Sequence, residues 1–324
     1  MNSLLIVALQ ILAALLLDRI FGEFTKYHPL VGFGNLANKL EARFNRLDKQ
    51  QSNPNNVLKI QGAVCSLVLV LPLPLLFGLV ANPSIIYLVV ETLILYLAIG
   101  QKSLCQHAMQ IFTPLLAGDI KQARHYTSYM VSRDTSKLTE SDMSRATVES
   151  VLENGHDAVI ASLFYFLIGG APLVILHRLV NTLDAMWGYK TAKFLHFGWF
   201  AAKFDDFLGF FSACFTSVLY LCKSRIFHNV FNGLSLAWQQ SNQYKSKNGG
   251  LCMSAGAQTL GISLGGSAYY HGQKTMTVTL GKGRKVAMQD IPLSIKLVNK
   301  SVYLLVACLL FIGLILQITT ISNP

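Results

Sequence analysis

Long apolar runs separated by polar stretches dominate the chain. A helix that crosses a hydrocarbon core of about 30 Å needs about 20 apolar residues. Six runs approach that length and predict spans at 2–20, 57–80, 84–100, 158–180, 206–222 and 301–321. The expected fold class is all-α, a polytopic membrane helix bundle formed by residues 1–324 as a single integral membrane domain.

Two of the predicted spans contain helix-breaking residues. The second holds Pro72 and Pro74, and the fourth holds Gly169-Gly170-Ala171-Pro172. Backbone groups freed at membrane depth are tolerated only where protein or a wet cavity covers them. We therefore expect the bundle to contain one or two broken or re-entrant segments.

Composition and charge support a membrane protein with polar loops on one side. Only 13% of residues are charged, against about 25% in an ordinary soluble domain, and the net charge is +11. Lys and Arg gather in the polar stretches at about 21–56, 101–157 and 223–300, which the positive-inside rule places in the cytoplasm. No basic stripe is interleaved with aromatic residues, so a nucleic-acid partner is not expected.

The polar stretch 181–205 does not fit that arrangement. With six plain spans it would lie outside, although it carries Lys190, Lys193 and Lys203. Either three positive charges oppose the rule, or the fourth and fifth segments re-enter on the same side. The Gly-Gly-Ala-Pro break favours re-entry.

An acidic helix face is the first candidate site. Thr139 begins a predicted helix on which Glu149 and Glu153 recur at four-residue spacing, and Asp157 follows if the helix continues. Mg²⁺ is usually held by one or two carboxylates together with substrate phosphates. The alternative is a solvated face on which Arg145 pairs with a glutamate.

A second candidate site combines residues 181–190 with Asp205 and Asp206. Polar residues this dense beside an apolar run are costly in lipid and are candidate functional groups. The alternative is a surface linker with Trp187 and Tyr189 as interfacial anchors. Asp18 and His28 give a weaker signal, since a helix cap and a satisfied interfacial histidine explain them equally well.

Four segments resemble the adenosylcobinamide-phosphate synthase family of cobalamin biosynthesis. They are LLLDRIFGE…YHPLVGFGNL, RDTSKL…RATVESVLENGHDAV, LIGGAPLV…NTLDAMWGYK…FGWFAAKFDD and LGISLGGSAYYHG. These matches run in order from about Asp18 to about Gly272. The chain lacks a GxxxxGK[ST] phosphate loop, so a nucleotide would be held by another device.

The resemblance implies an enzyme of the bacterial cytoplasmic (inner) membrane. Such a synthase joins aminopropanol phosphate, or aminopropanol, to a propionate of adenosylcobyric acid with ATP as co-substrate. The expected partners are therefore the corrinoid, ATP, aminopropanol phosphate and the lipid bilayer, with a cobalamin synthase and further copies of the chain as candidates.

The resemblance also suggests roles for individual residues. Mg²⁺ would be held by Glu149, Glu153 and Asp157, with Asn154 beside them. The candidate substrate- and phosphate-binding residues are Arg124, Arg133, Asp134, Asn181, Asp184, Lys190, Asp205, Asp206, Asp18 and His28.

Some positions depart from the family pattern. Ser212-Ala213-Cys214 stands where Pro-Ala-Arg is usual, and Lys247–Cys252 lacks the usual prolines. The competing interpretation is a non-enzymatic membrane sensor or regulator, similar to the family implicated in β-lactamase induction. In such a protein the acidic and Asn positions are expected to have decayed, whereas here they stand.

Overall fold

The computed structural model describes residues 3–23, 28–46, 54–131, 134–223, 230–270 and 273–322, and most of them are helical. The helices are α1 (Ser3–Phe21), α2 (Pro29–Phe44), α3 (Pro54–Val70), α4 (Pro72–Leu79), α5 (Ile85–Ala98), α6 (Gln101–Leu116), α7 (Ile120–Met130), α8 (Glu140–Gly155), η1 (His156–Ile160), α9 (Ala161–Trp187), α10 (Trp199–Leu221), α11 (Val230–Ser241), α12 (Lys247–Leu260) and α13 (Asp290–Ser322). Three strands, β1 (Ile262–Tyr270), β2 (Gln273–Gly281) and β3 (Arg284–Lys285), form one small sheet. The predicted polytopic helical fold is confirmed, and the sheet is an element that the prediction missed.

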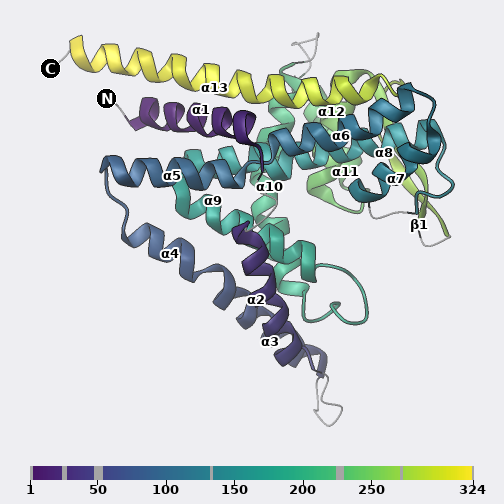
Figure 1. The fold of residues 1–324 in the computed structure, drawn as a ribbon, viewed down its shortest axis with the longest axis horizontal. Coiled ribbons are helices and arrows are strands. Elements are labelled where there is room, and N and C mark those ends of the chain that lie inside the picture. Colours follow the sequence, from purple (N-terminus) through teal and green to yellow (C-terminus); the bar gives the residue numbers. More distant parts are fainter. Residues whose placement is uncertain are drawn as a thin grey trace.

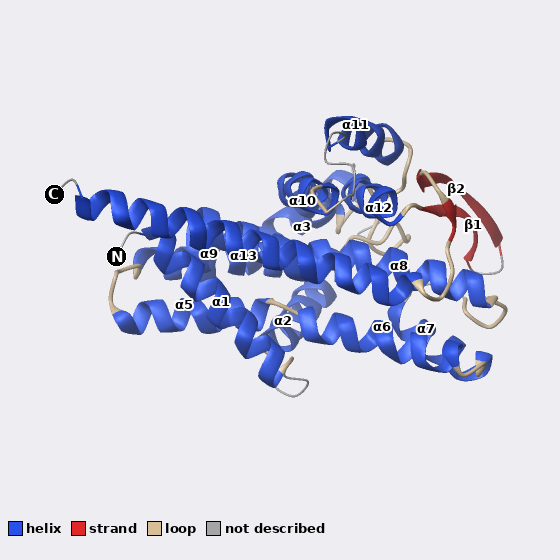
Figure 2. Ribbon diagram, turned by 90° about the horizontal axis from the view of Figure 1, so that it is seen from above, coloured by secondary structure: helices blue, strands red, loops and turns tan. Residues whose placement is uncertain are grey.

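Among the described residues, six helical segments are long and apolar enough to cross a membrane. They are Ser3–Phe21, Asn55–Leu79, Ile85–Leu116, Glu140–Trp187, Trp199–Leu221 and Asp290–Ile321, and every predicted span overlaps one of them. In Figure 1, α1, α5 and α13 run side by side, and both ends of the described chain lie at one end of the bundle. The opposite end carries α6, α7, α8, α11, α12 and the sheet, which project from one end of the bundle (Figures 1 and 2).

Both predicted helix breaks occur. α3 ends at Val70 and α4 begins at Pro72. In α9 the backbone leaves the helical region at Gly169 (φ −155°, ψ 28°) and Gly170 (φ 60°, ψ −151°). The two halves of α9 then fold back on each other. The ring of Tyr165 in the first half stacks on that of His177 in the second half, with their centroids 5.1 Å apart. α9 is thus a helical hairpin.

A carboxylate on α5 caps the second half of this hairpin. The backbone N–H of Ala171 donates to Oε1 of Glu91 at 3.1 Å, and Nε2 of Gln10 lies 3.4 Å from Oε2 of the same side chain. The first N–H groups of a helix have no partner within it, and at membrane depth water cannot supply one. Glu91 therefore fixes the hairpin tip against α1 and α5.

α10 also departs from a plain span. It runs crosswise to α13 in Figure 1 and is seen nearly end-on in Figure 2. Its principal partners are α12 and α9. The expectation that the region 158–222 does not cross as two plain spans is met by a hairpin followed by a transverse helix.

The sheet and α12 close the polar end. β1 pairs antiparallel with β2 and parallel with β3, and the β1–β2 register shifts between Gly265 and Gly266. The sequence Gly281-Lys282-Gly283 predicts a turn, and the turn is present, with Gly281 at φ +77°. Lys247-Asn248-Gly249-Gly250 also predicts a turn, and that prediction is wrong: these residues form the first turn of α12, where Ser246 caps the helix by accepting from the N–H of Gly249.

Candidate functional site

The acidic face of α8 is built as expected and is only partly exposed to solvent. Thr139 and Asp142 form a reciprocal capping box at the helix start. Glu149 is 6% exposed, and its Oε1 accepts a hydrogen bond of 2.8 Å from the backbone N–H of Gly265. The alternative of a solvated face is therefore wrong at Glu149. This residue joins α8 to the glycine bulge of β1.

One turn further along α8, the helix packs against the start of α12. Gly249 lies so close to Glu153 that a Cβ at this glycine would collide with Oε1 of the glutamate. Asn154 is exposed, and its Nδ2 donates to the backbone O of Ser150 at 2.9 Å. Sequence reasoning missed Gly249, whose role depends on a contact about 100 positions away along the chain.

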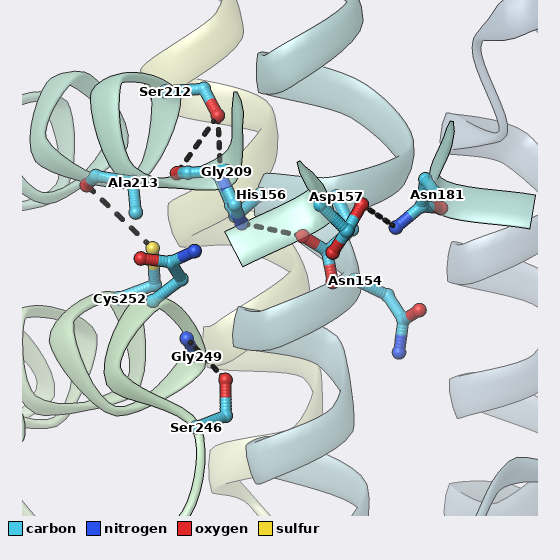
Figure 3. A network of polar contacts seen from close by, with 12 residues as sticks. Asn154, His156, Asp157, Asn181, Gly209, Ser212, Ala213, Ser246, Gly249 and Cys252 are labelled. Carbon is cyan, nitrogen blue, oxygen red and sulfur yellow. Dashed lines mark hydrogen bonds and ion pairs between the residues drawn. The ribbon is translucent and has the colours of Figure 1, made fainter. Parts of the chain in front are cut away.

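Asp157 belongs to a chain of polar contacts that runs into the protein interior (Figure 3). Its Oδ1 lies 2.7 Å from Nδ1 of His156, and Nε2 of His156 lies 2.8 Å from Oγ of Ser212. His156 and Ser212 are buried, whereas the Asp157 side chain is 34% exposed. The buried pair therefore orients a carboxylate whose outer part stays accessible. Sequence reasoning selected neither His156 nor Ser212.

The α9 hairpin brings its polar end to this carboxylate. Nη1 of Arg178 lies 3.5 Å from the backbone O of Asp157, and Nδ2 of Asn181 lies 3.4 Å from Oδ1 of Asp205 at the start of α10. Asp205 is within electrostatic reach of Asp157 and Asp184. Polar residues from three distant stretches of the sequence thus meet in one place.

α12 adds a further contact at the start of α10. Nδ2 of Asn248 donates to the backbone O of Asp206 at 2.9 Å, and the exposed Asp206 side chain pairs with Lys203 at 3.3 Å. We call Asp157, Asp184, Asp205 and Asp206 the acidic cluster. It lies beside the Glu153–Gly249 contact, where α8, α9, α10 and α12 converge.

Two predicted site residues make contacts between helices. Asp18 is buried, and its Oδ2 accepts from the backbone N–H of Lys102 at 2.9 Å, which joins the end of α1 to the start of α6. His28 caps α2: its Nδ1 accepts from the N–H of Leu30, and its Nε2 lies 3.3 Å from the backbone O of Leu97.

The predicted phosphate-binding residues Arg124 and Asp134 make no described contact with the acidic cluster. Arg124 donates from Nε to the backbone O of Leu138 at 2.9 Å. Asp134 is exposed and accepts from the N–H of Ser136, a bond that lowers the pKa of its carboxyl group. Arg133 lies outside the described residues. Lys190 is exposed in the segment after α9.

The carboxylates do not form a preassembled metal cage. In the described part of the chain, His, Cys, Asp and Glu side chains form no group of three or more arranged to hold a metal ion. One oxygen of Glu149 is held by Gly265, and one of Asp157 by His156. Because Mg²⁺ commonly takes one or two carboxylates with several waters and phosphate oxygens, this donor set fits a cation that arrives with phosphate.

Comparison with known proteins identifies the family. The family model described as CobD/Cbib protein matches residues 11–298. The chain belongs to the CobD/Cbib family. The resemblance seen in the sequence is thereby confirmed over most of the chain.

Relatives in this family are similar over nearly their whole length. The cobalamin biosynthesis protein CobD of Chromobacterium violaceum is 43% identical over 304 residues, which cover 94% of this chain and 95% of the relative. CobD of Stutzerimonas stutzeri is 41% identical over 95% of this chain and 98% of the relative. CobD of Halalkalibacterium halodurans is 35% identical over 94% and 96%. No solved structure matches the chain.

Proposed function

We propose that this chain is an adenosylcobinamide-phosphate synthase, an enzyme of cobalamin biosynthesis in the bacterial cytoplasmic membrane. It joins the amino group of aminopropanol phosphate, or of aminopropanol, to one propionate of adenosylcobyric acid. Family membership at 43% identity over 94% of the chain supports the assignment. The structural observation that carries it is the hairpin contact that brings Arg178 beside Asp157, together with the Asn181–Asp205 contact.

The proposed chemistry needs an activated carboxylate. A free propionate resists attack by an amine, because an oxide ion is too poor a leaving group. Transfer of the γ-phosphoryl group of ATP to a propionate oxygen gives an acyl phosphate and ADP. The amine nitrogen then attacks the acyl carbon and loses a proton, and inorganic phosphate leaves with the former propionate oxygen. When bound, Mg²⁺ offsets charge on the transferring phosphoryl group.

The residues divide into two sides in this proposal. Glu149, Glu153 and Asp157 would hold Mg²⁺, directly or through water, on the side of the nucleotide phosphates. Asp184 and Asp205 face the amine, binding it as an ammonium ion and accepting the proton that it releases. The acidic cluster suits a cation of this kind, since several carboxylates lie within reach of one another.

Re-entry of the hairpin makes this arrangement compatible with the position of ATP. The polar end of α9 returns to the side from which its first half started, which is the side of α8. The positive charges of Lys190 and Lys203 then lie on the cytoplasmic side, as the positive-inside rule requires.

The assay is ATP-dependent amide formation. Membranes enriched in the chain are incubated with adenosylcobyric acid, Mg²⁺–ATP and aminopropanol phosphate or aminopropanol, and the corrinoid products are measured by mass spectrometry. We expect adenosylcobinamide phosphate or adenosylcobinamide, and none without ATP or from membranes lacking the chain. A chain that inserts normally yet forms no amide with either amine would instead support the non-enzymatic regulator.

A further inference from the structure

Arg178 is a cation of the site whose hydrogen-bonding capacity is largely unused. It lies in the second half of α9, one turn before Asn181, and is half-buried. A guanidinium group carries five N–H donors. The described contacts of Arg178 contain one side-chain hydrogen bond, the 3.5 Å contact from Nη1 to the backbone O of Asp157. Its Nε is buried and has no partner among the described residues.

Two other cations of the chain have a carboxylate partner. Arg284 makes two 2.7 Å contacts with the two carboxylate oxygens of Asp290, and Lys193 lies 2.9 Å from Glu41. Within the described ranges, the ion pairs shorter than 4 Å do not include Arg178. A half-buried guanidinium without a carboxylate partner is unusual, because leaving a charged donor unsatisfied costs free energy.

Three acids lie near Arg178 without forming an ion pair with it among the described residues. Asp157, Glu23 and Asp205 are within electrostatic reach of the guanidinium and offset part of the cost of its burial. One oxygen of Asp157 contacts His156 at 2.7 Å, and one oxygen of Asp205 accepts from Asn181. The acids therefore act on the cation at a distance and leave most of its N–H donors without a carboxylate partner.

We propose that Arg178 binds a phosphate group of a substrate. The planar fork of arginine matches two phosphate oxygens at once and recognises phosphate better than the point charge of lysine. The inference rests on the proposed function, in which both ATP and aminopropanol phosphate carry a phosphate group. It also assigns the phosphate-binding role to a residue on the hairpin instead of the exposed Lys190.

The test is ligand binding by the purified full-length chain in nanodiscs. Wild type, Arg178→Met and Arg178→Lys are titrated with ATP, aminopropanol phosphate, aminopropanol and inorganic phosphate by isothermal calorimetry. Arg46→Met is the matched control, since Arg46 is exposed and donates only to the backbone O of Ala42 among its described contacts. Thermal unfolding of each variant reports on folding.

We expect Arg178→Met to weaken one phosphate-bearing substrate by about tenfold or more, the value of a charge-assisted hydrogen bond. Whichever of ATP and aminopropanol phosphate weakens identifies the bound group. Aminopropanol should bind equally to all variants, and Arg178→Lys should restore part of the affinity. Arg46→Met should match wild type.

Four results would overturn the inference. The first is unchanged binding of ATP and aminopropanol phosphate by Arg178→Met, and the second is an equal loss for aminopropanol with and without its phosphate. If Arg178→Met does not fold, Arg178→Lys decides, and wild-type affinity of this variant for both phosphate-bearing ligands is the third result. A wild type that binds neither ATP nor either amine refutes the proposed function, and the role of Arg178 is then tested with inorganic phosphate. No binding of inorganic phosphate by wild type is the fourth result.

Discussion

Substitution of Gly170 by alanine tests the hairpin on which the site depends. Gly170 has φ 60° and ψ −151°, a region that is essentially restricted to glycine and that costs other residues about 1–3 kcal/mol. A Cβ at this position would also collide with Oε1 of Glu91. Displacing that oxygen leaves the buried N–H of Ala171 unsatisfied, which costs about 1–3 kcal/mol more. The combined destabilisation is roughly 2–6 kcal/mol.

The assay is thermal unfolding of the purified protein in detergent, followed by amide formation in the same preparations. A loss of this size lowers Tm by about 4–18 °C if each kcal/mol shifts a protein of this size by about 2–3 °C. The second half of α9 carries Asn181 and Asp184, so activity should fall with it. Gly78→Ala in α4 is the control, because a Cβ there meets nothing within 4 Å and alanine favours helix. Equal Tm values for the two variants would refute the proposed tip geometry.

Three further predictions concern the site, a buried thiol and the topology. Glu153→Gln should lower the rate of amide formation at least about 100-fold while the protein still inserts, which is the scale of a lost transition-state contact. A loss below about threefold would mean that Glu153 lies on a solvated face and has no role in the reaction. Burial raises the pKa of the Cys252 thiol well above its usual range, so maleimide should label it at neutral pH only after the protein unfolds. Rapid labelling of Cys252 in the native protein would show that this thiol is not buried. Reporters fused after Lys137 and Lys245 should be cytoplasmic and one at Asn82 external; an external reading at Lys137 would overturn the orientation.

The breaks in the helices could be predicted because proline and glycine act locally. Pro72 and Gly170 mark them in the structure as they do in the sequence. The start of α8 was equally readable, since Thr139 and Asp142 form a capping box within one turn. The density of polar residues grouped Asn181 with Asp205 and Asp206, and the resemblance to the family joined this group to the acidic face of α8.

Other features depend on contacts that a linear pattern does not contain. An apolar run predicts a helix at 206–222, but its crosswise direction follows from packing against α12 and α9. Lys247–Gly250 contains turn-forming residues, yet the Ser246 cap starts a helix there. Arg178 and His156 lie inside or beside apolar stretches. Arg178 reaches Asp157 because the hairpin folds back, and His156 contacts Ser212 because α10 packs beside it.

The sidedness of Thr191 shows whether the α9 hairpin re-enters and brings its polar end to the side of α8. This exposed residue follows α9, so its position reports where the hairpin returns. The variant Thr191→Cys, in a chain whose native cysteines are replaced, is labelled with a membrane-impermeant maleimide in right-side-out and inverted vesicles. We expect labelling only in inverted vesicles, from the cytoplasmic face. Labelling only from the outside would place Asn181 and Asp184 across the bilayer from Glu153 and would rule out re-entry of the hairpin.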